Sequence, residues 1–241
     1  MHNSILYIIG IETMSLLKKI VTIIMFLMII VTVPYLIYEW HSHEELGSND
    51  MGYVTKDIYN HYNAEKTIIL ITGIHPRENL AINPEIESAK RFALTHNAIL
   101  INYNVTVTKD AEDYKNSRYN GEHLVADIVL PDIYKSKADA VIISHSHIEG
   151  YGEGFYLATP AMDDESVRIA EGVKNSGIDF NYFKTDKNAT SYESTSIELV
   201  SKPLADRGYP TLVYEIPENI TEQESTDRTY DLLVKTFELL N

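Results

Sequence analysis

The chain has no cysteine, and this absence excludes several kinds of site at once. Without cysteine there is no disulfide, no thiolate nucleophile and no cysteine-ligated zinc or iron–sulfur centre. Any bound metal ion must therefore be held by histidine and carboxylate side chains. The sequence offers nine histidines as candidate ligands.

Basic residues are also scarce. The 241 residues include 20 lysines and arginines against 35 aspartates and glutamates, which gives a net charge of −15. Such a charge repels phosphate backbones, so nucleic acid is a poor candidate partner. Internal repeats and low-complexity tracts are lacking too. A content of 44% hydrophobic and 23% charged residues is typical of a folded globular chain.

One long apolar run is present near the N-terminus. Residues 20–38 carry no charge, and at about 1.5 Å per residue they are long enough to cross a ~30 Å hydrocarbon core as a helix. Tyr35, Tyr38 and Trp40 at its end favour an uncleaved membrane anchor, because a cleaved secretory signal ends in small residues. The sequence therefore predicts one transmembrane helix.

Charges on the two sides of this run predict its orientation. Lys18 and Lys19 precede it and acidic residues follow it, which places residues 1–19 in the cytoplasm and the rest of the chain outside. Met14 begins an ordinary signal-anchor sequence, and we expect it to be the true start. Residues 39–63 are polar and are predicted to be a stalk or irregular linker.

Residues 64–241 alternate between strand and helix patterns. Strands are predicted at 67–72, 99–107, 138–144, 155–158, 180–183 and 211–216, and helices at 86–94, 122–134, 166–173, 196–205 and 221–240. A capping box from Thr221 to Glu224 opens the last helix. The alternation predicts a three-layer α/β domain with a mostly parallel, mixed sheet.

Candidate chemical groups stand at the ends of three predicted strands. His75 and Glu78 follow the first strand of this domain, His145 and His147 end the third, and Glu215 lies in the last. Ligands of such sheets bind beyond the carboxyl ends of the strands, so we expect these side chains to converge. Two histidines and a carboxylate that leave a fourth position for water form the pattern of catalytic zinc.

Each of these residues taken singly is a weak signal. The His-x-x-Glu spacing also occurs from His41 to Glu44, outside any predicted buried strand. His75 beside Pro76 is explained equally well as a turn residue, and His145 as a strand-end histidine with a hydrogen-bond partner. Their joint occurrence with a carboxylate in an apolar strand favours a metal site.

The segment from Gly73 to Glu78, Gly-Ile-His-Pro-Arg-Glu, resembles a zinc-binding segment of the zinc carboxypeptidases. That carboxypeptidase A-like family includes succinylglutamate desuccinylase and aspartoacylase relatives. The resemblance implies that His75 and Glu78 bind one Zn²⁺ per chain. His145-Ser-His147 is similar to the family's His-Ser-aromatic strand end, which implies His145 as third ligand and leaves His147 as the alternate.

Further residues are assigned only through this resemblance. The strand from Thr211 resembles the one that carries the family's general base, here Glu215, and Tyr192 falls near the family's mobile substrate-contacting tyrosine. Arg118 falls where the family places carbonyl-polarising and carboxylate-binding arginines. The implied catalytic residues are therefore Glu215, Arg118 and Tyr192. The implied substrate-binding residues are Arg77, Arg118 and Asn120, although Arg77 also suits a surface ion pair.

Three functions are compatible with this sequence. The first is a membrane-anchored, extracytoplasmic zinc carboxypeptidase or amidase that hydrolyses peptides, including cell-wall peptides. The second is a deacylase of small N-acyl amino acids. The third is an anchored, non-catalytic binding module of the same fold, which would have no need of Glu215 as a base. The partners expected are the substrate and the membrane.

Overall fold

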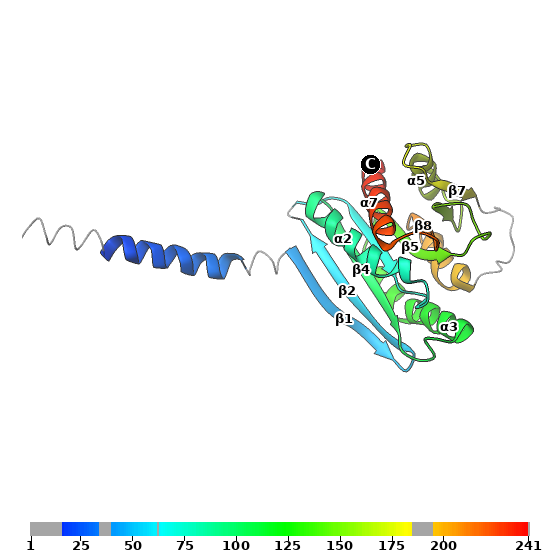
Figure 1. The fold of residues 1–241 in the computed structure, drawn as a ribbon, viewed down its shortest axis with the longest axis horizontal. Helices are drawn as coiled ribbons and strands as arrows, with labels where there is room; N and C mark the ends of the chain where they lie inside the picture. Colours follow the sequence, from blue (N-terminus) through cyan, green and yellow to red (C-terminus); the bar gives the residue numbers. More distant parts are fainter. Residues whose placement is uncertain (1–15, 34–39, 62, 185–194, 241) are drawn as a thin grey trace, which may run out of the picture. The chain divides into compact units, whose positions relative to one another are not determined.

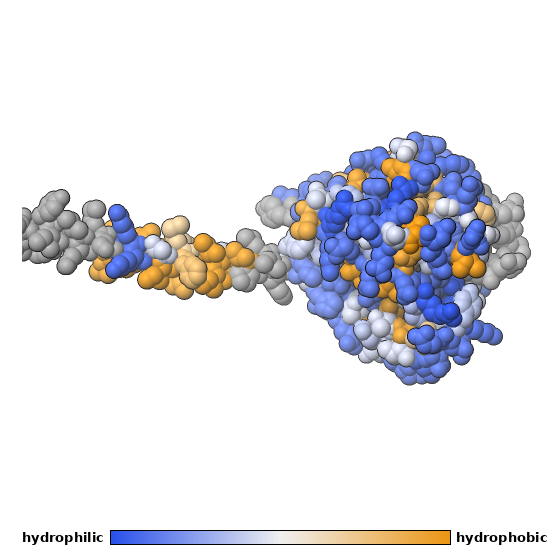
Figure 2. Space-filling model, in the orientation of Figure 1, coloured by the Kyte–Doolittle hydropathy of each residue, from blue (hydrophilic) through white to orange (hydrophobic). Residues whose placement is uncertain are grey.

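The computed structural model describes residues 16–33, 40–61, 63–184 and 195–240, and the chain divides into two units, residues 1–41 and 42–241. The first unit contains the helix Leu16–Val33, which is apolar and long enough to cross a membrane. A signal sequence near the N-terminus can meet the same criteria of length and hydropathy. Figure 2 shows the hydrophobic side chains that cover this helix. It begins four residues before the predicted run, whose last part lies outside the described residues.

A mixed sheet of eight strands forms the centre of the second unit, as far as the structure describes it (Figure 1). Its order is β1-β2-β4-β3-β5-β8-β6-β7. The four central strands β4, β3, β5 and β8 are parallel, while β2 and β6 run antiparallel to their neighbours β4 and β8. The strands are β1 (His41–Asn49), β2 (Gly52–Asn60), β3 (Thr67–Thr72), β4 (Ile99–Val107), β5 (Ala140–His147), β6 (Tyr156–Thr159), β7 (Asn181–Lys184) and β8 (Thr211–Pro217).

The segment predicted to be a stalk, residues 39–63, belongs largely to this sheet, so that prediction is wrong. Strands β1 and β2 cover residues 41–49 and 52–60, and β2 pairs with β4 from Gly52↔Val107 to Asn60↔Ile99. β1 lies at the edge of the sheet and is mostly exposed. An exposed edge strand needs no apolar face, so its sequence lacks the hydrophobic alternation typical of a half-buried strand.

Helices cover both faces of the sheet and complete the predicted three layers. One face carries α2 (Asn83–Thr95), α5 (Asp164–Lys174) and α7 (Glu222–Leu239), all three labelled in Figure 1. The other face carries α3 (Tyr114–Leu124), the π-helical turn η2 (Val125–Val129), α4 (Leu130–Ile133), the π-helical turn η3 (Ile197–Ser201) and α6 (Lys202–Asp206). The expected α/β fold is therefore confirmed.

Strand β3 shows how burial fixes the sheet. Ile68 to Ile71 are all fully buried, and alternate side chains point to opposite faces. Ile69 and Ile71 pack into the cluster formed with η2, α4 and α6. Burying each such side chain contributes roughly 1.5–3 kcal/mol, so the strand is held firmly from both sides.

Helix α3 begins earlier than the sequence predicts. The predicted helix starts at Glu122, whereas the observed helix starts at Tyr114. Asp113 is its N-cap: the Asp113 side chain accepts a hydrogen bond from the backbone N–H of Asn116. The added turns, residues 114–121, are polar, and their buried residues are Ser117, Asn120 and Gly121. Hydrophobic periodicity therefore gives no signal over this stretch.

Glu85, in the first turn of α2, is a carboxylic acid buried completely between α2, β5 and α7. Its Oε2 accepts a hydrogen bond of 2.6 Å from Ser144, and its Oε1 accepts one of 2.8 Å from Thr229. Burial raises the pKa of Glu85 to about 7, although both hydroxyl contacts act to lower it. The folded protein therefore holds this proton over a pH range in which the unfolded chain releases it.

The Glu85→Gln substitution tests that protonation. A carboxyl pKa raised from 4.5 in the unfolded chain to about 7 in the fold lowers stability as pH rises between these values. The contribution lost is on the order of 3 kcal/mol. Thermal unfolding from pH 4.5 to 8 should show that the Glu85→Gln variant lacks this loss and is more stable than the unaltered protein at pH 8. Parallel curves for the two proteins would contradict the assignment.

Candidate functional site

The turn after β3 brings His75 and Glu78 together. Gly73 has φ +75°, and a side chain there would place its Cβ 2.3 Å from the carbonyl oxygen of Val105. Only glycine fits this position without strain. The backbone N–H of Glu78 then donates to the carbonyl of His75 at 3.0 Å, and Glu78 directly precedes the short helix η1 (Asn79–Ala81) without using its side chain as a cap.

His145, near the end of β5, reaches the same point. Glu78 Oε1 lies 2.8 Å from His75 Nδ1, and Glu78 Oε2 lies 3.0 Å from His145 Nδ1. The two Nδ1 atoms are 3.1 Å apart. The three residues are 2%, 8% and 5% exposed, and the potential ligand atom of each lies within 4.8 Å of the others. The arrangement can hold a metal ion.

The residues of this group shift one another's pKa values. Burial acts to raise the pKa of Glu78, but the two histidines outweigh it and hold the pKa well below its usual range. Burial acts to lower the pKa of His75, but hydrogen bonds to Glu122 and Glu78 raise it instead. Two imidazole Nδ1 atoms this close cannot both carry a proton, so at least one of them directs a lone pair into the group. When both rings are neutral and carry their proton on Nε2, both lone pairs and the carboxylate can bind one cation.

The outer nitrogen of each histidine has a partner of its own. His75 Nε2 lies 3.3 Å from Glu122 Oε1, and His145 Nε2 lies 3.3 Å from the Ser196 hydroxyl. Such contacts fix which ring nitrogen faces a metal and how the ring is turned. Sequence analysis missed both residues. The one available signal is that Glu122 follows Arg118 by four residues, which puts them on one helix face.

Gly121 lets α3 approach the turn closely enough for Glu122 to reach His75. A Cβ at Gly121 would lie 1.7 Å from the carbonyl oxygen of Ile74, the residue before His75. No side chain fits there without moving the helix or the turn. The glycine therefore sets the distance between α3 and the histidine.

Arg118 lies at the rim of the group. Its Nη1 donates to Glu78 Oε1 at 2.6 Å, and its side chain is 31% exposed. Tyr114 contacts the guanidinium groups of Arg118 and Arg77, whose carbons lie 5.5 and 5.9 Å from its ring centroid. Two arginines thus stand beside the group, in a protein whose net charge is strongly negative.

Glu215 lies beside His145 in the sheet. The two are register partners in the parallel pair β5 and β8, so their side chains share one face. Burial raises the pKa of Glu215 to about 7; His145 acts to lower it and Glu78 to raise it. A carboxyl group of this kind is suited to accept and release a proton near neutral pH.

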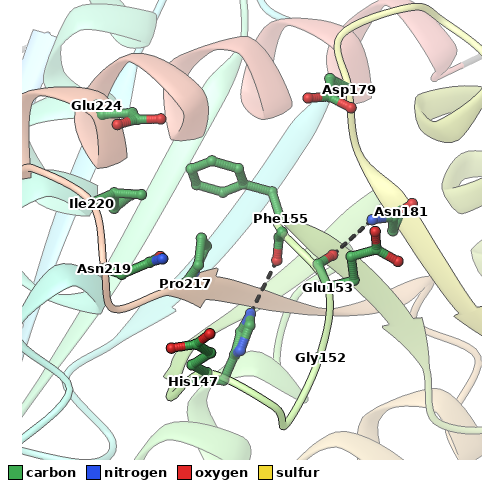
Figure 3. A pocket seen from close by; sticks show the side chains of 12 residues that line it. His147, Gly152, Glu153, Phe155, Asp179, Asn181, Pro217, Asn219, Ile220 and Glu224 are labelled. Atoms are coloured by element: carbon green, nitrogen blue, oxygen red, sulfur yellow. Dashed lines mark hydrogen bonds between the residues drawn. The ribbon is translucent and has the colours of Figure 1, made fainter.

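His147, the alternate ligand, lies away from the other three residues of the predicted site. Its Nε2 lies 3.0 Å from the carbonyl oxygen of Gly154, a contact drawn in Figure 3. It lines a cavity of about 390 Å³ formed by the loop before β6, the end of β8 and the start of α7. None of His75, Glu78 and His145 lines this cavity.

Two further predicted residues do not join the group. Asn120 is 6% exposed, and its Nδ2 donates to the carbonyl of Lys109 at 2.8 Å. The amide of Asn120 holds the loop before α3, and its substrate-binding role stays a prediction. Tyr192 lies outside the described residues.

No family model matches the sequence, and no curated protein matches it. The fold is similar to that of a metallo-carboxypeptidase from Burkholderia cenocepacia, with a TM-score of 0.58 and 14% identity. It is also similar to a metallo-carboxypeptidase from Pseudomonas aeruginosa (TM-score 0.52, 11% identity) and to a succinylglutamate desuccinylase/aspartoacylase from Rhodobacter sphaeroides (TM-score 0.51, 12% identity).

Each of these comparisons covers 83% of this chain. The chain spans only 64% of the first neighbour and 65% of the other two. At such low identity the likeness concerns the fold, and it confirms the fold that the sequence resemblance implied. The chain therefore has the fold of the zinc carboxypeptidases and of their desuccinylase and aspartoacylase relatives.

Proposed function

We propose that the protein is a zinc-dependent hydrolase of peptide or amide bonds, with His75, Glu78 and His145 as the metal ligands. The observation that carries this proposal is the convergence of two imidazole Nδ1 atoms and one carboxylate within 2.8–3.1 Å. The similarity of the fold to metallo-carboxypeptidases supports it.

The donor set fits zinc. Two histidine nitrogens and one carboxylate are the ligands of open, catalytic zinc sites, which leave a fourth position for water or substrate. When bound, zinc would lower the pKa of that water and polarise the carbonyl to be attacked. Glu122 and Ser196 would keep the two Nδ1 atoms directed at the ion.

Glu215 and Arg118 supply the remaining chemistry. Glu215, on the same face as His145, would take a proton from the attacking water and deliver it to the leaving amine. Arg118 uses one nitrogen on Glu78, and the other N–H groups of its guanidinium remain to stabilise a developing oxyanion or hold a substrate carboxylate. Arg77 would assist from the rim.

Peptides are the substrate class we propose, with cell-wall peptides as the first group to test. The Rhodobacter neighbour favours a second candidate, hydrolysis of a small N-acyl amino acid. A digest of a peptide library beside a panel of N-acyl amino acids separates the two, since a deacylase would leave the peptides intact.

The helix Leu16–Val33 is proposed to anchor the enzyme, with the catalytic domain on the outer side of the membrane. Its support is the apolar length of the helix together with Lys18 and Lys19, since positive charges stay on the cytoplasmic side.

Protease treatment of intact cells tests this topology. An externally added protease should remove the domain while a cytoplasmic marker protein stays intact. A domain that is cleaved only after the cells are lysed would reverse the orientation, and release of a shortened chain into the medium would identify the helix as a cleaved signal.

Metal analysis tests the ligand set. The purified full-length chain should carry one zinc ion. Its affinity should fall as the pH is lowered, starting above the usual titration range of histidine, because the histidines must be neutral to bind and the pKa of His75 is raised. His145→Ala should lose the ion, and the matched variant His147→Ala should keep it. The opposite result would make His147 the ligand.

Glu215→Gln tests the proposed base. This change keeps the shape of the side chain and removes its basicity, so hydrolysis of a substrate from the digest should fall by at least about a hundredfold. Zinc content and the unfolding temperature should stay as in the unaltered protein. Undiminished hydrolysis would exclude Glu215 as the base, and loss of zinc would make it a ligand.

A further inference from the structure

A second buried carboxyl group, Glu85, lies behind the sheet, on the face opposite the metal ligands. Its hydrogen bonds come from Ser144 on β5 and Thr229 on α7. The Thr229 hydroxyl lies in turn 3.3 Å from the hydroxyl of Tyr214 on β8. Three separate elements therefore meet around one carboxyl group that belongs to a fourth, α2.

The strand residues in this network stand directly behind the proposed site. Ser144 precedes His145, Tyr214 precedes Glu215, and Ser144 and Tyr214 are register partners. Successive side chains of a strand point to opposite faces of the sheet. The network therefore holds Ser144 and Tyr214 on one face, while His145 and Glu215, which follow them, lie on the face of the proposed metal site.

Helix α2 connects Glu85 to the His75–Glu78 turn. The His75–Glu78 turn leads through η1 into α2, and Glu85 lies in the first turn of that helix. The hydrogen bond that Ser144 donates to Glu85 thus joins the strand that carries His145 to the helix that follows the His75–Glu78 turn.

We propose that Glu85 is a positioning residue for the metal site, and that its hydrogen bonds through Ser144 and Thr229 set the relative positions of Glu78, His145 and Glu215. This inference rests on the metal role proposed above. Glu85 itself would touch neither metal nor substrate, because it lies on the face of the sheet that α2 and α7 cover.

Folding alone does not account for a carboxylic acid at this place. Glu85 is removed from water, and among the described residues the hydrogen bonds that compensate for its lost hydration come only from the Ser144 and Thr229 hydroxyl groups. An apolar side chain of similar volume would fill the same space without that loss of hydration. A carboxyl group at this position is explained by its hydrogen bonds, which lie directly behind the proposed metal site.

The test compares Co²⁺ binding by the full-length chain and three variants, followed through the visible absorption of the bound ion. Glu85→Leu keeps the volume and removes both hydrogen bonds, whereas Glu85→Gln keeps groups that can make them. Ser88→Ala is the matched control, since Ser88 is another buried polar residue between α2 and α7, bonded to the carbonyls of Pro84 and Thr226.

We expect the Glu85→Leu variant to bind Co²⁺ with an affinity at least about 10-fold lower and with an altered absorption spectrum. An effect of this size is typical of residues that orient metal ligands without binding the metal themselves. Glu85→Gln and Ser88→Ala should stay within about threefold of the unaltered chain. Unfolding temperatures measured without metal ensure that the compared variants are folded. If Glu85→Leu does not fold, Ser144→Ala takes its place with the same expected direction.

The outcomes separate this inference from the proposed function. A folded Glu85→Leu, or Ser144→Ala in its place, that binds Co²⁺ like Ser88→Ala, with an unchanged spectrum, would overturn the positioning role and leave the metal site standing. Failure of the unaltered chain to bind Co²⁺ would overturn the metal site and the positioning role together.

Discussion

The carboxylate of Glu78 is the group around which the candidate site is organised. It is largely removed from water, and a buried charge of this kind needs compensation from its surroundings. His75, His145, the Arg118 guanidinium and the Ser146 backbone N–H all contact its two oxygens. The turn after β3, the end of β5 and helix α3 are therefore held at one point by a single charge.

The order of the strands makes this meeting possible. β3, β5 and β8 are adjacent and parallel, so their carboxyl ends reach the same edge of the sheet. His75 follows the first of them, while His145 and Glu215 are register partners near the ends of the other two. Buried aliphatic residues on both faces fix these strands, and rigid strands give the polar residues at their ends defined positions.

Both faces of the sheet take part in the site. On one face, Gly121 allows α3 to bring Glu122 against His75, and Ser196 holds the second histidine. On the other face, Glu85 links α2 with Ser144 of β5 and, through Thr229, approaches Tyr214 of β8. The positions of the converging side chains thus depend on packing that lies outside the site itself.

The sequence by itself determined the elements that carry strong local patterns. The buried runs at 67–72 and 99–107 have the predicted bounds, and the capping residue Thr221 accepts from the Glu224 N–H as expected. Tertiary structure alone decided what depends on remote neighbours. No local hydrophobic signal marks the exposed edge strand β1, the polar start of α3 or the loop role of Asn120. The partners Glu122 and Ser196 contact histidines that are 47 and 51 positions away in the sequence. Local sequence encodes burial and backbone preference, whereas such contacts exist only once the fold has placed distant segments side by side.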